Sequence, residues 1–441
     1  MHITLINHAC VKIEFEQFAL LCDPWLDGPA FNFGWDLLVK TPMTLDAIMD
    51  GVRYIFISHE HPDHFAPKFF TDIRERWSQQ VSILFHETRD KRVKNFCQAR
   101  GFRVIEMADR SLYSLDGGVN AICGRHHFYD SWLHLSNGYY SLLNINDCQI
   151  HDESELRKLA KALGPLDVLL TQFSYAAWKG GRRNSTYREA EARRRLINIG
   201  NQVRRLRPCW TIPFASMMYF SNQENSYMND QMNTPRAASD AISAAGGIAV
   251  ALFPGDRWTV GEQPDSRVAL DAWDEVYKSR SCLPLRGPGE SVSLKALAAQ
   301  FENYRQGIFA KNSRPLVYFL RHLPIVDAFR PVNIQLSDQD VTVSVSVVDG
   351  FRPVTGGSAD VRMHSSSLAF IFDHEFGYDT LLVNGRFEAS ASGFSRMSKS
   401  LAVGLLNALG VAVSPRLALN PDFIWLVFSK LATIRSRLAA A

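Results

Sequence analysis

The feature that most constrains the fold is the stretch YIFISHEHPDHF, residues 54–65. Its apolar first half predicts a buried strand. Four ligand-type side chains follow this strand directly, namely His59, His61, Asp63 and His64. Because side chains two positions apart in an extended segment lie on one side, His59 and His61 can hold one metal ion. Asp63 and His64 come after a proline turn and can reach a second ion, so the loop predicts a dinuclear site.

Imidazole and carboxylate groups together suit zinc, iron or manganese. A chance grouping of polar loop residues is the simplest alternative interpretation. We reject it because four ligand-type side chains within six consecutive positions, residues 59–64, form a specific pattern. The loop is therefore interpreted as a metal site.

Short apolar segments alternate with helical segments through the first 290 residues. Many strands with interposed helices predict a layered α/β architecture. The expected strands are 2–8, 11–15, 18–26, 52–58, 81–87, 102–107, 119–127, 139–147, 167–173, 209–215 and 247–256. The expected helices are 67–77, 88–101 and 152–164.

The pattern changes beyond residue 290, and no clear flexible linker marks the change. We expect a metal-binding domain over residues 1–290 and a smaller α+β domain over residues 291–441, with a boundary between 285 and 330. The segments behind this prediction are a helix at 293–309, antiparallel strands at 332–350 and 359–389, and closing helices at 398–411 and 420–440.

Charge and cysteine content bound the function further. A net charge of +3 gives no reason to expect a nucleic acid or membrane partner. The first residues lack the pattern of a signal peptide, and no run of about 18 apolar residues predicts a membrane span. The seven cysteines are widely spaced without a C-x-x-C pair, which predicts reduced, mostly buried thiols in a cytoplasmic protein.

The H-x-H-x-D-H pattern after an apolar strand resembles the signature of the metallo-β-lactamase superfamily. The resemblance implies an α/β fold of the αββα sandwich type. It also implies a site role for the early Asp23 in LLCDPWL and a metal-bridging role for Asp147 in LLNINDC. The third histidine of the superfamily corresponds to GRHHFYD, where spacing favours His126 as the ligand and leaves His127 as the alternative.

The sequence departs from the superfamily at the last histidine ligand, which usually follows a late strand. The corresponding segment, residues 209–220, carries no histidine, and none occurs between His151 and His322. His151 and His8 are the candidates to fill this place at the catalytic site. His8 would equally suit a hydrogen-bond partner of a ligand, and His151 would equally suit the surface start of a helix.

Several motifs resemble one branch of the superfamily. DPWLDGPAF, SHEHPDHF, LLNINDC, RPCWTIPFA and FPGDRW are similar to the catalytic part of CMP-N-acetylneuraminic acid hydroxylase over residues 1 to roughly 300. That hydroxylase also has a Rieske iron–sulfur domain, whose paired cysteine and histidine motifs are absent from this sequence. The architecture is also similar to stand-alone non-heme diiron monooxygenases of natural-product biosynthesis, so the resemblance implies a separate reductase as partner.

The resemblance implies a diiron monooxygenase that uses O₂ to hydroxylate a C–H bond of a small-molecule biosynthetic intermediate. Iron is the favoured metal for both positions. The alternative is a dinuclear zinc or manganese hydrolase, in which metal-bound water attacks an ester, lactone or phosphodiester.

An arginine-rich stretch at residues 179–208 offers a place for the substrate. Lys179, Arg182 and Arg183 lie in a glycine-flanked turn. Such a turn can pair with the phosphate of a nucleotide-sugar or a coenzyme A thioester. The alternative is a solvated helix face, since the run Arg193–Arg195 cannot point in one direction.

The late segment GYDTLLVNGRFEA, residues 377–389, faintly resembles sterol-carrier-like modules. The resemblance implies an apolar ligand pocket in the C-terminal domain. A domain that only packs against the rest of the chain is the alternative.

Overall fold

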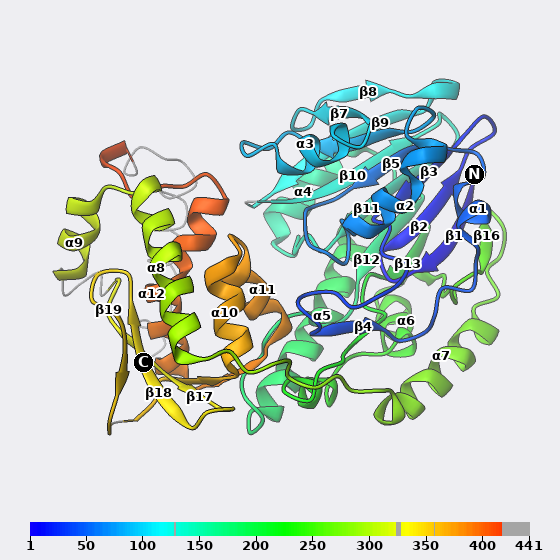
Figure 1. Ribbon diagram of the computed structural model, residues 1–441. Coiled ribbons are helices and arrows are strands. Elements are labelled where there is room, and N and C mark those ends of the chain that lie inside the picture. Colours follow the sequence, from blue (N-terminus) through cyan, green and yellow to red (C-terminus); the bar gives the residue numbers. More distant parts are fainter. Residues whose placement is uncertain (128, 323–327, 357, 417–441) are drawn as a thin grey trace. The chain divides into compact units, whose positions relative to one another are not determined.

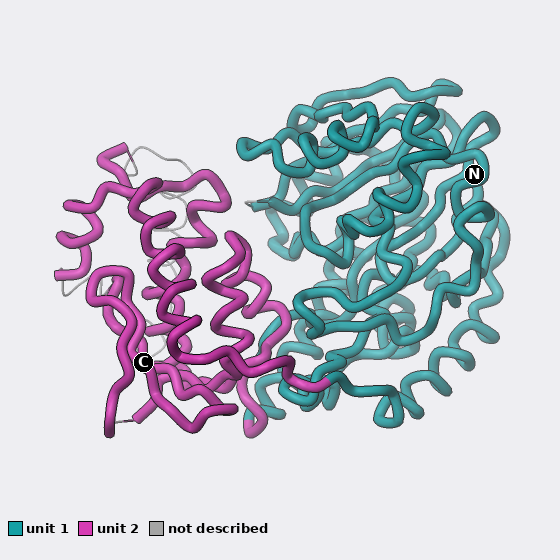
Figure 2. The backbone as a smooth tube through the Cα atoms, in the orientation of Figure 1, with its two compact units in different colours: residues 1–179, 184–286 teal, residues 180–183, 287–441 magenta. Residues whose placement is uncertain are grey.

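The computed structural model describes the chain except residues 128, 323–327, 357 and 417–441 (Figure 1). The chain divides into two compact units (Figure 2). Unit 1 comprises residues 1–179 and 184–286, and unit 2 comprises residues 180–183 and 287–441. The helix predicted at 420–440 lies outside the described residues.

Two seven-stranded sheets form the centre of unit 1. The strands of the first sheet are β1 (His2–Asn7), β2 (Cys10–Glu14), β3 (Ala19–Cys22), β5 (Val52–Ile57), β6 (Ser82–His86), β7 (Arg103–Met107) and β16 (Arg257–Thr259). The strands of the second sheet are β8 (Leu112–Ser114), β9 (Asn120–His126), β10 (Asp130–Ser136), β11 (Ser141–Asn146), β12 (Val168–Gln172), β13 (Trp210–Phe214) and β15 (Ile248–Ala249). Their orders are β16-β1-β2-β3-β5-β6-β7 and β15-β13-β12-β11-β10-β9-β8.

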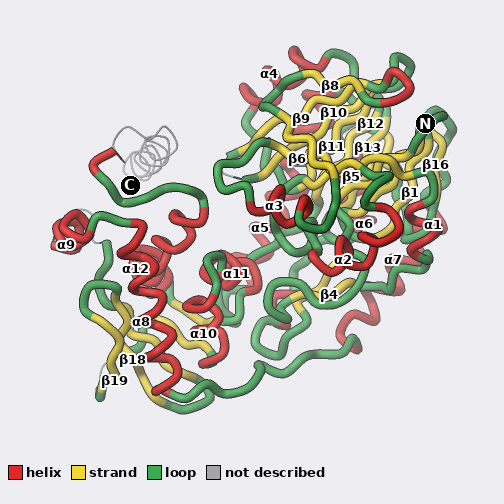
Figure 3. Tube along the Cα trace, turned by 45° about the horizontal axis from the view of Figure 1, so that its top comes forward, coloured by secondary structure: helices red, strands yellow, loops and turns green. Residues whose placement is uncertain are grey.

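Helices cover the strands of unit 1 (Figure 3). They are α1 (Leu45–Met49), α2 (Pro67–Trp77), α3 (Arg92–Gln98), α4 (Glu153–Leu163), α5 (Ser185–Leu206), α6 (Pro235–Ala244) and α7 (Arg267–Ser279). A small pair, β4 (Trp35–Leu37) and β14 (Met218–Phe220), and 3₁₀ turns at Asp116–Gly118, Ser226–Asn229 and Arg280–Cys282 complete the unit.

Alternation along β3 shows how the layers form. Leu20 and Cys22 belong to the core between the two sheets, whereas Ala19 and Leu21 belong to the core that α1, α2 and α3 build on the other face of the first sheet. The period of two follows from strand geometry. On the second sheet, α4 and α5 cover the outer face in the same way. The predicted αββα sandwich is therefore confirmed.

Helix α2 begins and ends where the sequence predicts. Pro67 occupies its first turn, where a missing N–H costs nothing. Phe69, Phe70 and Ile73 form its buried face against the first sheet. Burial of each such side chain stabilises the fold by about 1.5–3 kcal/mol. This packing fixes one end of the metal-binding loop, residues 58–66, which connects β5 to α2.

Unit 2 contains a five-stranded sheet in the order β19-β18-β17-β20-β21, together with helices. The strands are β17 (Val332–Leu336), β18 (Val341–Ser346), β19 (Gly350–Val354), β20 (Val361–Met363) and β21 (Phe387–Ala389). The helices are α8 (Leu294–Lys311), α9 (Arg314–His322), α10 (Ser365–Asp373), α11 (Gly377–Asn384) and α12 (Ala391–Ala408).

The prediction of antiparallel strands throughout residues 359–389 is wrong. Most of this segment forms α10 and α11, and β20 pairs with β17 in parallel. The His364 side chain accepts a hydrogen bond from Ser366 N–H and caps α10, while Gly385 ends α11 with a φ of 65°. These capping signals, together with burial of Ile371 and Phe372 on α10, outweigh the strand preference of the Phe and Ile residues in this segment.

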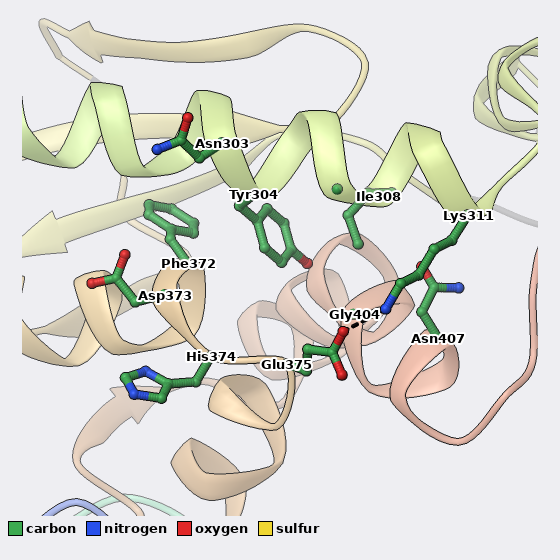
Figure 4. A pocket seen from close by; sticks show the side chains of 11 residues that line it. Asn303, Tyr304, Ile308, Lys311, Phe372, Asp373, His374, Glu375, Gly404 and Asn407 are labelled. Atoms are coloured by element: carbon green, nitrogen blue, oxygen red, sulfur yellow. Dashed lines mark hydrogen bonds and ion pairs between the residues drawn. The ribbon is translucent and has the colours of Figure 1, made fainter. Parts of the chain in front are cut away.

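A pocket of about 390 Å³ lies in unit 2 between α8, α12 and the α10–α11 connection (Figure 4). The side chains of Tyr304, Ile308 and Phe372 supply apolar surface. Lys311 and Glu375 form an ion pair at its margin.

All seven cysteines are free, and five of them are buried. Among the described residues, no helix combines the length and apolar character needed to cross a membrane.

Candidate metal centre

Asp23 lies at the base of the metal-binding loop. Its Oδ1 accepts a hydrogen bond of 2.7 Å from Ser58 N–H, and its own N–H donates to Phe56 O at 2.9 Å. Asp23 is fully buried directly after β3, with a φ of 43°. The carboxylate therefore ties the end of β3 to the point where the loop leaves β5.

Three loop histidines converge next to Ser58. The ring centroids of His59 and His64 are 4.2 Å apart, and those of His59 and His61 are 4.7 Å apart. Ser58 Oγ lies 3.0 Å from Nδ1 of His59 and 3.3 Å from Nδ1 of His64. Engagement of Nδ1 leaves Nε2 of both rings to bind a metal.

Two groups of ligand atoms share His64. Its Nε2 lies 3.2 Å from Oδ2 of Asp63 and 3.5 Å from Oδ2 of Asp147. In one group, ligand atoms of His8, Asp63 and His64 all lie within 4.8 Å of one another; in the other, the same holds for His59, His64 and Asp147. This arrangement can hold two adjacent ions.

His126 ends β9 and is buried, whereas His127 is exposed with a φ of 53°. Nδ1 of His126 lies 3.3 Å from Oε1 of Glu155. Its Nε2 is buried without a hydrogen-bond partner among the described residues. A carboxylate on one ring nitrogen commonly orients a histidine whose other nitrogen binds a metal. The geometry therefore favours His126 over His127.

Asp130 lies beside these candidate ligands, although no sequence motif points to it. It stands directly opposite His126 in the antiparallel pair of β9 and β10. Its Oδ1 lies 4.0 Å from Nε2 of His59. Burial raises the pKa of Asp130 to about 6; His61 opposes this shift and Asp147 adds to it. Recognition of the β9–β10 hairpin is the signal that would have placed Asp130 here, because opposite residues of such a pair share one face.

The structure separates the two histidines proposed for the missing ligand position. Nε2 of His8, in the β1–β2 turn, lies 3.3 Å from Oδ2 of Asp63. His151 is exposed, and its Nδ1 contacts the backbone carbonyl of Gln149 at 2.6 Å. Only His8 joins the ligand group around Asp63.

Electrostatics divide the histidines into two kinds. Burial, with His64 and His61 nearby, holds the pKa of His59 well below 6.5, so this ring is neutral and its lone pair is available to a metal. Burial also opposes charge on His64. Nevertheless, the carboxylates of Asp63, Asp147 and Asp23 raise the pKa of His64 well above 6.5.

The donor set fits metal ions. Nε2 of His59, Nε2 of His126 and Oδ1 of Asp63 are buried without hydrogen-bond partners among the described residues. Unpartnered buried polar atoms are costly and rare in folded proteins. Coordination to a cation would satisfy these atoms, and imidazole with carboxylate suits iron, zinc or manganese.

The predicted phosphate-binding turn has carboxylate partners of its own. Lys179 Nζ lies 3.4 Å from Oε2 of Glu191. Within unit 2, Arg182 N–H donates to Glu388 Oε2 at 3.2 Å, and its Nε lies 3.6 Å from Oε1 of the same residue. Arg183 is exposed.

Curated proteins provide the first comparison. No family model matches the chain. A Mycobacterium tuberculosis protein whose name describes a Rieske 2Fe-2S iron–sulfur protein is 25% identical over 251 residues, which cover 53% of this chain and 47% of that protein. Cytidine monophosphate-N-acetylneuraminic acid hydroxylase of Mus musculus is 24% identical over 306 residues, covering 62% and 52%. The chain thus spans about half the length of these relatives.

Solved structures provide the second comparison. CmlA, a diiron β-hydroxylase from Streptomyces venezuelae, is 17% identical with a TM-score of 0.43, and the match covers 58% of this chain and 53% of that chain. An isothiocyanate hydrolase from Delia radicum gut bacteria is 12% identical with a TM-score of 0.43, covering 59% and 98%.

The sandwich and its H-x-H-x-D-H loop define a protein of the metallo-β-lactamase fold. Within that class, the chain is similar to the hydroxylases that its sequence motifs resemble, and this resemblance is confirmed. The hydroxylase and the hydrolase with which it compares are enzymes.

Proposed function

We propose that the chain is a non-heme diiron monooxygenase that hydroxylates a C–H bond of a small-molecule intermediate with O₂. The observation that carries this proposal is the carboxylate of Asp130, 4.0 Å from His59 Nε2, in addition to those of Asp63 and Asp147. Carboxylate oxygens are hard donors and suit iron in its oxidised state. The similarity to hydroxylases supports the same assignment.

The ligands would divide between two positions, and the superfamily resemblance implies that Asp147 would serve both. The resemblance implies that His59, His61 and His126 would hold one ion, beside Asp130. Asp63 and His64, grouped with His8, would hold the other. When bound, the iron pair supplies the electrons and open coordination positions that reduction of O₂ requires.

Neighbouring side chains orient these ligands. Oδ2 of Asp23 lies 3.3 Å from Nδ1 of His64, and Glu155 holds Nδ1 of His126. Gln172 Nε2 donates to Asp147 Oδ1 at 2.9 Å, which leaves Oδ2 directed at His64. Such partners fix the rotation of each ligand and raise its affinity for metal.

Hydroxylation by this route consumes two electrons for each O₂, in addition to those that come from the substrate. A separate reductase as partner would supply them. One relative bears the name of a Rieske iron–sulfur protein, which fits an electron-transfer route of this kind.

Metal analysis with O₂ uptake tests the proposal. We expect about two iron ions per chain and O₂ consumption that depends on added reductant. A variant with both His59→Ala and Asp63→Ala is the control and should lose iron and O₂ uptake together. Stoichiometric zinc or manganese, hydrolysis of an ester, lactone or phosphodiester, and no O₂ uptake would replace the proposal with the hydrolase alternative.

We also propose that unit 2 binds an apolar group, as the resemblance to sterol-carrier-like modules implies. The pocket of about 390 Å³ supports this role because Tyr304, Ile308 and Phe372 line it. Small-molecule pockets are commonly concave and largely apolar.

A further inference from the structure

Helix α5 buries two arginines on the same face, and their surroundings differ. Arg188 is 1% exposed, and its guanidinium makes two hydrogen bonds of 2.7 Å to the carboxylate of Asp230. Arg195, two turns later, is 6% exposed. Within the described part of the chain, Arg195 forms no hydrogen bond or ion pair, and its Nε is buried without a partner.

A buried guanidinium without a counter-charge is costly, because desolvation of a cation must be offset by an anion or by hydrogen bonds. Arg193 and Arg194, its neighbours, are 72% and 47% exposed at their side chains and pair with Glu189 and Glu191. Arg195 therefore differs from the rest of the arginine run. Neither a partner on α5 nor contact with solvent offsets the desolvation of the Arg195 guanidinium.

Contacts of α5 place the helix segment that carries Arg195 against the end of β12, which leads to the metal centre. One turn before it, the Ala192 carbonyl accepts a hydrogen bond from Asn233, which also donates to Phe173 O. Two turns after it, Gln202 accepts from Thr171 Oγ1 at 2.8 Å. The helix around Arg195 is thus tied to both sides of Gln172.

Gln172 in turn donates to Asp147 Oδ1 at 2.9 Å. Asp147 belongs to the ligand group with His59 and His64. The chain of contacts therefore runs from the α5 segment that carries Arg195 to a ligand of the proposed metal centre.

Positive charge is in excess at this place. Lys179 and Arg194 share one carboxylate, that of Glu191, at 3.4 and 2.7 Å. Glu191 precedes Arg195 by one turn. Burial, and then the neighbouring Arg194, lower the pKa of Arg195, although Asp147 and Glu191 oppose the shift. Glu191 is already paired with Lys179 and Arg194, so Arg195 has no carboxylate of its own within ion-pair distance among the described residues.

We propose that Arg195, with Lys179 beside it, binds an anionic group of the substrate next to the metal centre. The chemistry suits a carboxylate or a phosphate, because a guanidinium pairs with the oxygens of either in a bidentate manner. Assignment of the anion to the substrate rests on the proposed function, whereas the anion site itself does not.

Anion binding to the full-length chain tests the site directly. Inorganic phosphate and acetate are titrated separately, at low ionic strength, into chelator-treated protein by calorimetry. Arg195→Met keeps much of the side-chain volume and removes the charge, and Arg193→Met is the matched control on the exposed face. We expect at least one anion to bind the native chain and Arg193→Met equally, and to bind Arg195→Met about 10- to 100-fold more weakly.

The stronger of the two anions identifies the chemistry. Equal affinity of the native chain and Arg195→Met, or no binding of either anion to the native chain, overturns the inference. Thermal unfolding supplies a second measurement. Removal of an unpaired buried charge should leave the Tm of Arg195→Met unchanged or raised, and a lowered Tm would show that Arg195 stabilises the fold instead.

The result of the anion-binding test can be distinguished from the result of the test of the proposed function. Iron content and O₂ uptake are measured on metal-loaded protein, and anion affinity on metal-free protein. A chain that binds two irons and consumes O₂ but shows no Arg195-dependent anion affinity keeps the monooxygenase assignment and loses the anion site. A chain that is purified with zinc, but whose metal-free form shows Arg195-dependent anion affinity, keeps the anion site and loses the monooxygenase assignment.

Discussion

Nε2 of His8 lies 3.3 Å from Oδ2 of Asp63. His8 follows β1 and Asp63 follows β5, and because these two strands run in the same direction, both residues lie at one edge of the first sheet. The β1–β2 turn brings His8 to the loop that follows β5. The second ligand group therefore includes a histidine although the late strand of the sandwich supplies none.

We expect His8→Ala to weaken one of the two metal positions by at least about 10-fold, because His8 completes a group with Asp63 and His64. Metal analysis after exhaustive dialysis should find about one ion per chain in place of two. His151→Ala, which removes the exposed histidine, should keep both ions. Retention of two ions by His8→Ala would place His8 outside the metal centre.

Asp130→Asn tests the carboxylate that carries the monooxygenase proposal. The amide keeps the shape of the side chain but removes the charge beside His59. We expect iron affinity to fall by about 10- to 100-fold and reductant-dependent O₂ uptake to fall with it. Asp109→Asn is the control, because Asp109 is half exposed and instead accepts a hydrogen bond from Arg125 N–H. Equal iron content in the two variants would contradict the role given to Asp130.

Most of the elements predicted for unit 1 were recognised from patterns within short sequence segments. Pro67 and the apolar spacing of Phe69, Phe70 and Ile73 specify α2 without help from the rest of the fold. The metal-binding loop was recognisable for the same reason, since its candidate ligands His59, His61, Asp63 and His64 lie within six positions of the sequence.

The residues that could not be placed from the sequence depend on pairing between strands or on helix faces. Asp130 joins the site only through the register that sets it opposite His126. Arg195 was grouped with a solvated arginine run, and its burial is decided by how α5 packs on the second sheet. In residues 359–389, the capping roles of His364 and Gly385 outweighed strand-forming residues.

Asp338 should make the stability of unit 2 depend on pH. Burial opposes its charge, but hydrogen bonds from Ser291 and Ser365 lower its pKa to about 2. A pKa depressed below the usual 3.8 means that the unfolded chain binds the proton more readily. The stabilisation is therefore complete above about pH 4 and is lost as the pH falls towards 2.

Accordingly, Asp338→Asn should lower the free energy of unfolding by about 1–2 kcal/mol at pH 7, and the difference from the native chain should shrink towards zero at low pH. Urea unfolding at pH 7, 4 and 3 measures this difference. Asp340→Asn, at an exposed position two residues away, should show no such pH dependence. A constant difference across the three pH values would mean that Asp338 acts through packing and not through its charge.

Gly307 allows the unit 2 pocket to be filled without disturbing its helix. It lies inside α8 and lines the pocket, and a Cβ added there would meet no atom within 4 Å. Because glycine in a helix interior costs about 0.5–1 kcal/mol relative to alanine, Gly307→Ala should stabilise the protein by that amount.

Gly307→Leu should fold equally well and occupy space that an apolar ligand needs. Binding of a fluorescent apolar probe such as anilinonaphthalene sulfonate should therefore be retained by Gly307→Ala and lost in Gly307→Leu. Gly404→Ala is the contrasting variant, because its Cβ would lie 3.0 Å from the Tyr304 hydroxyl, and it should lower the Tm. Equal probe binding by Gly307→Leu and the native chain would show that the probe, and any apolar ligand it represents, binds elsewhere.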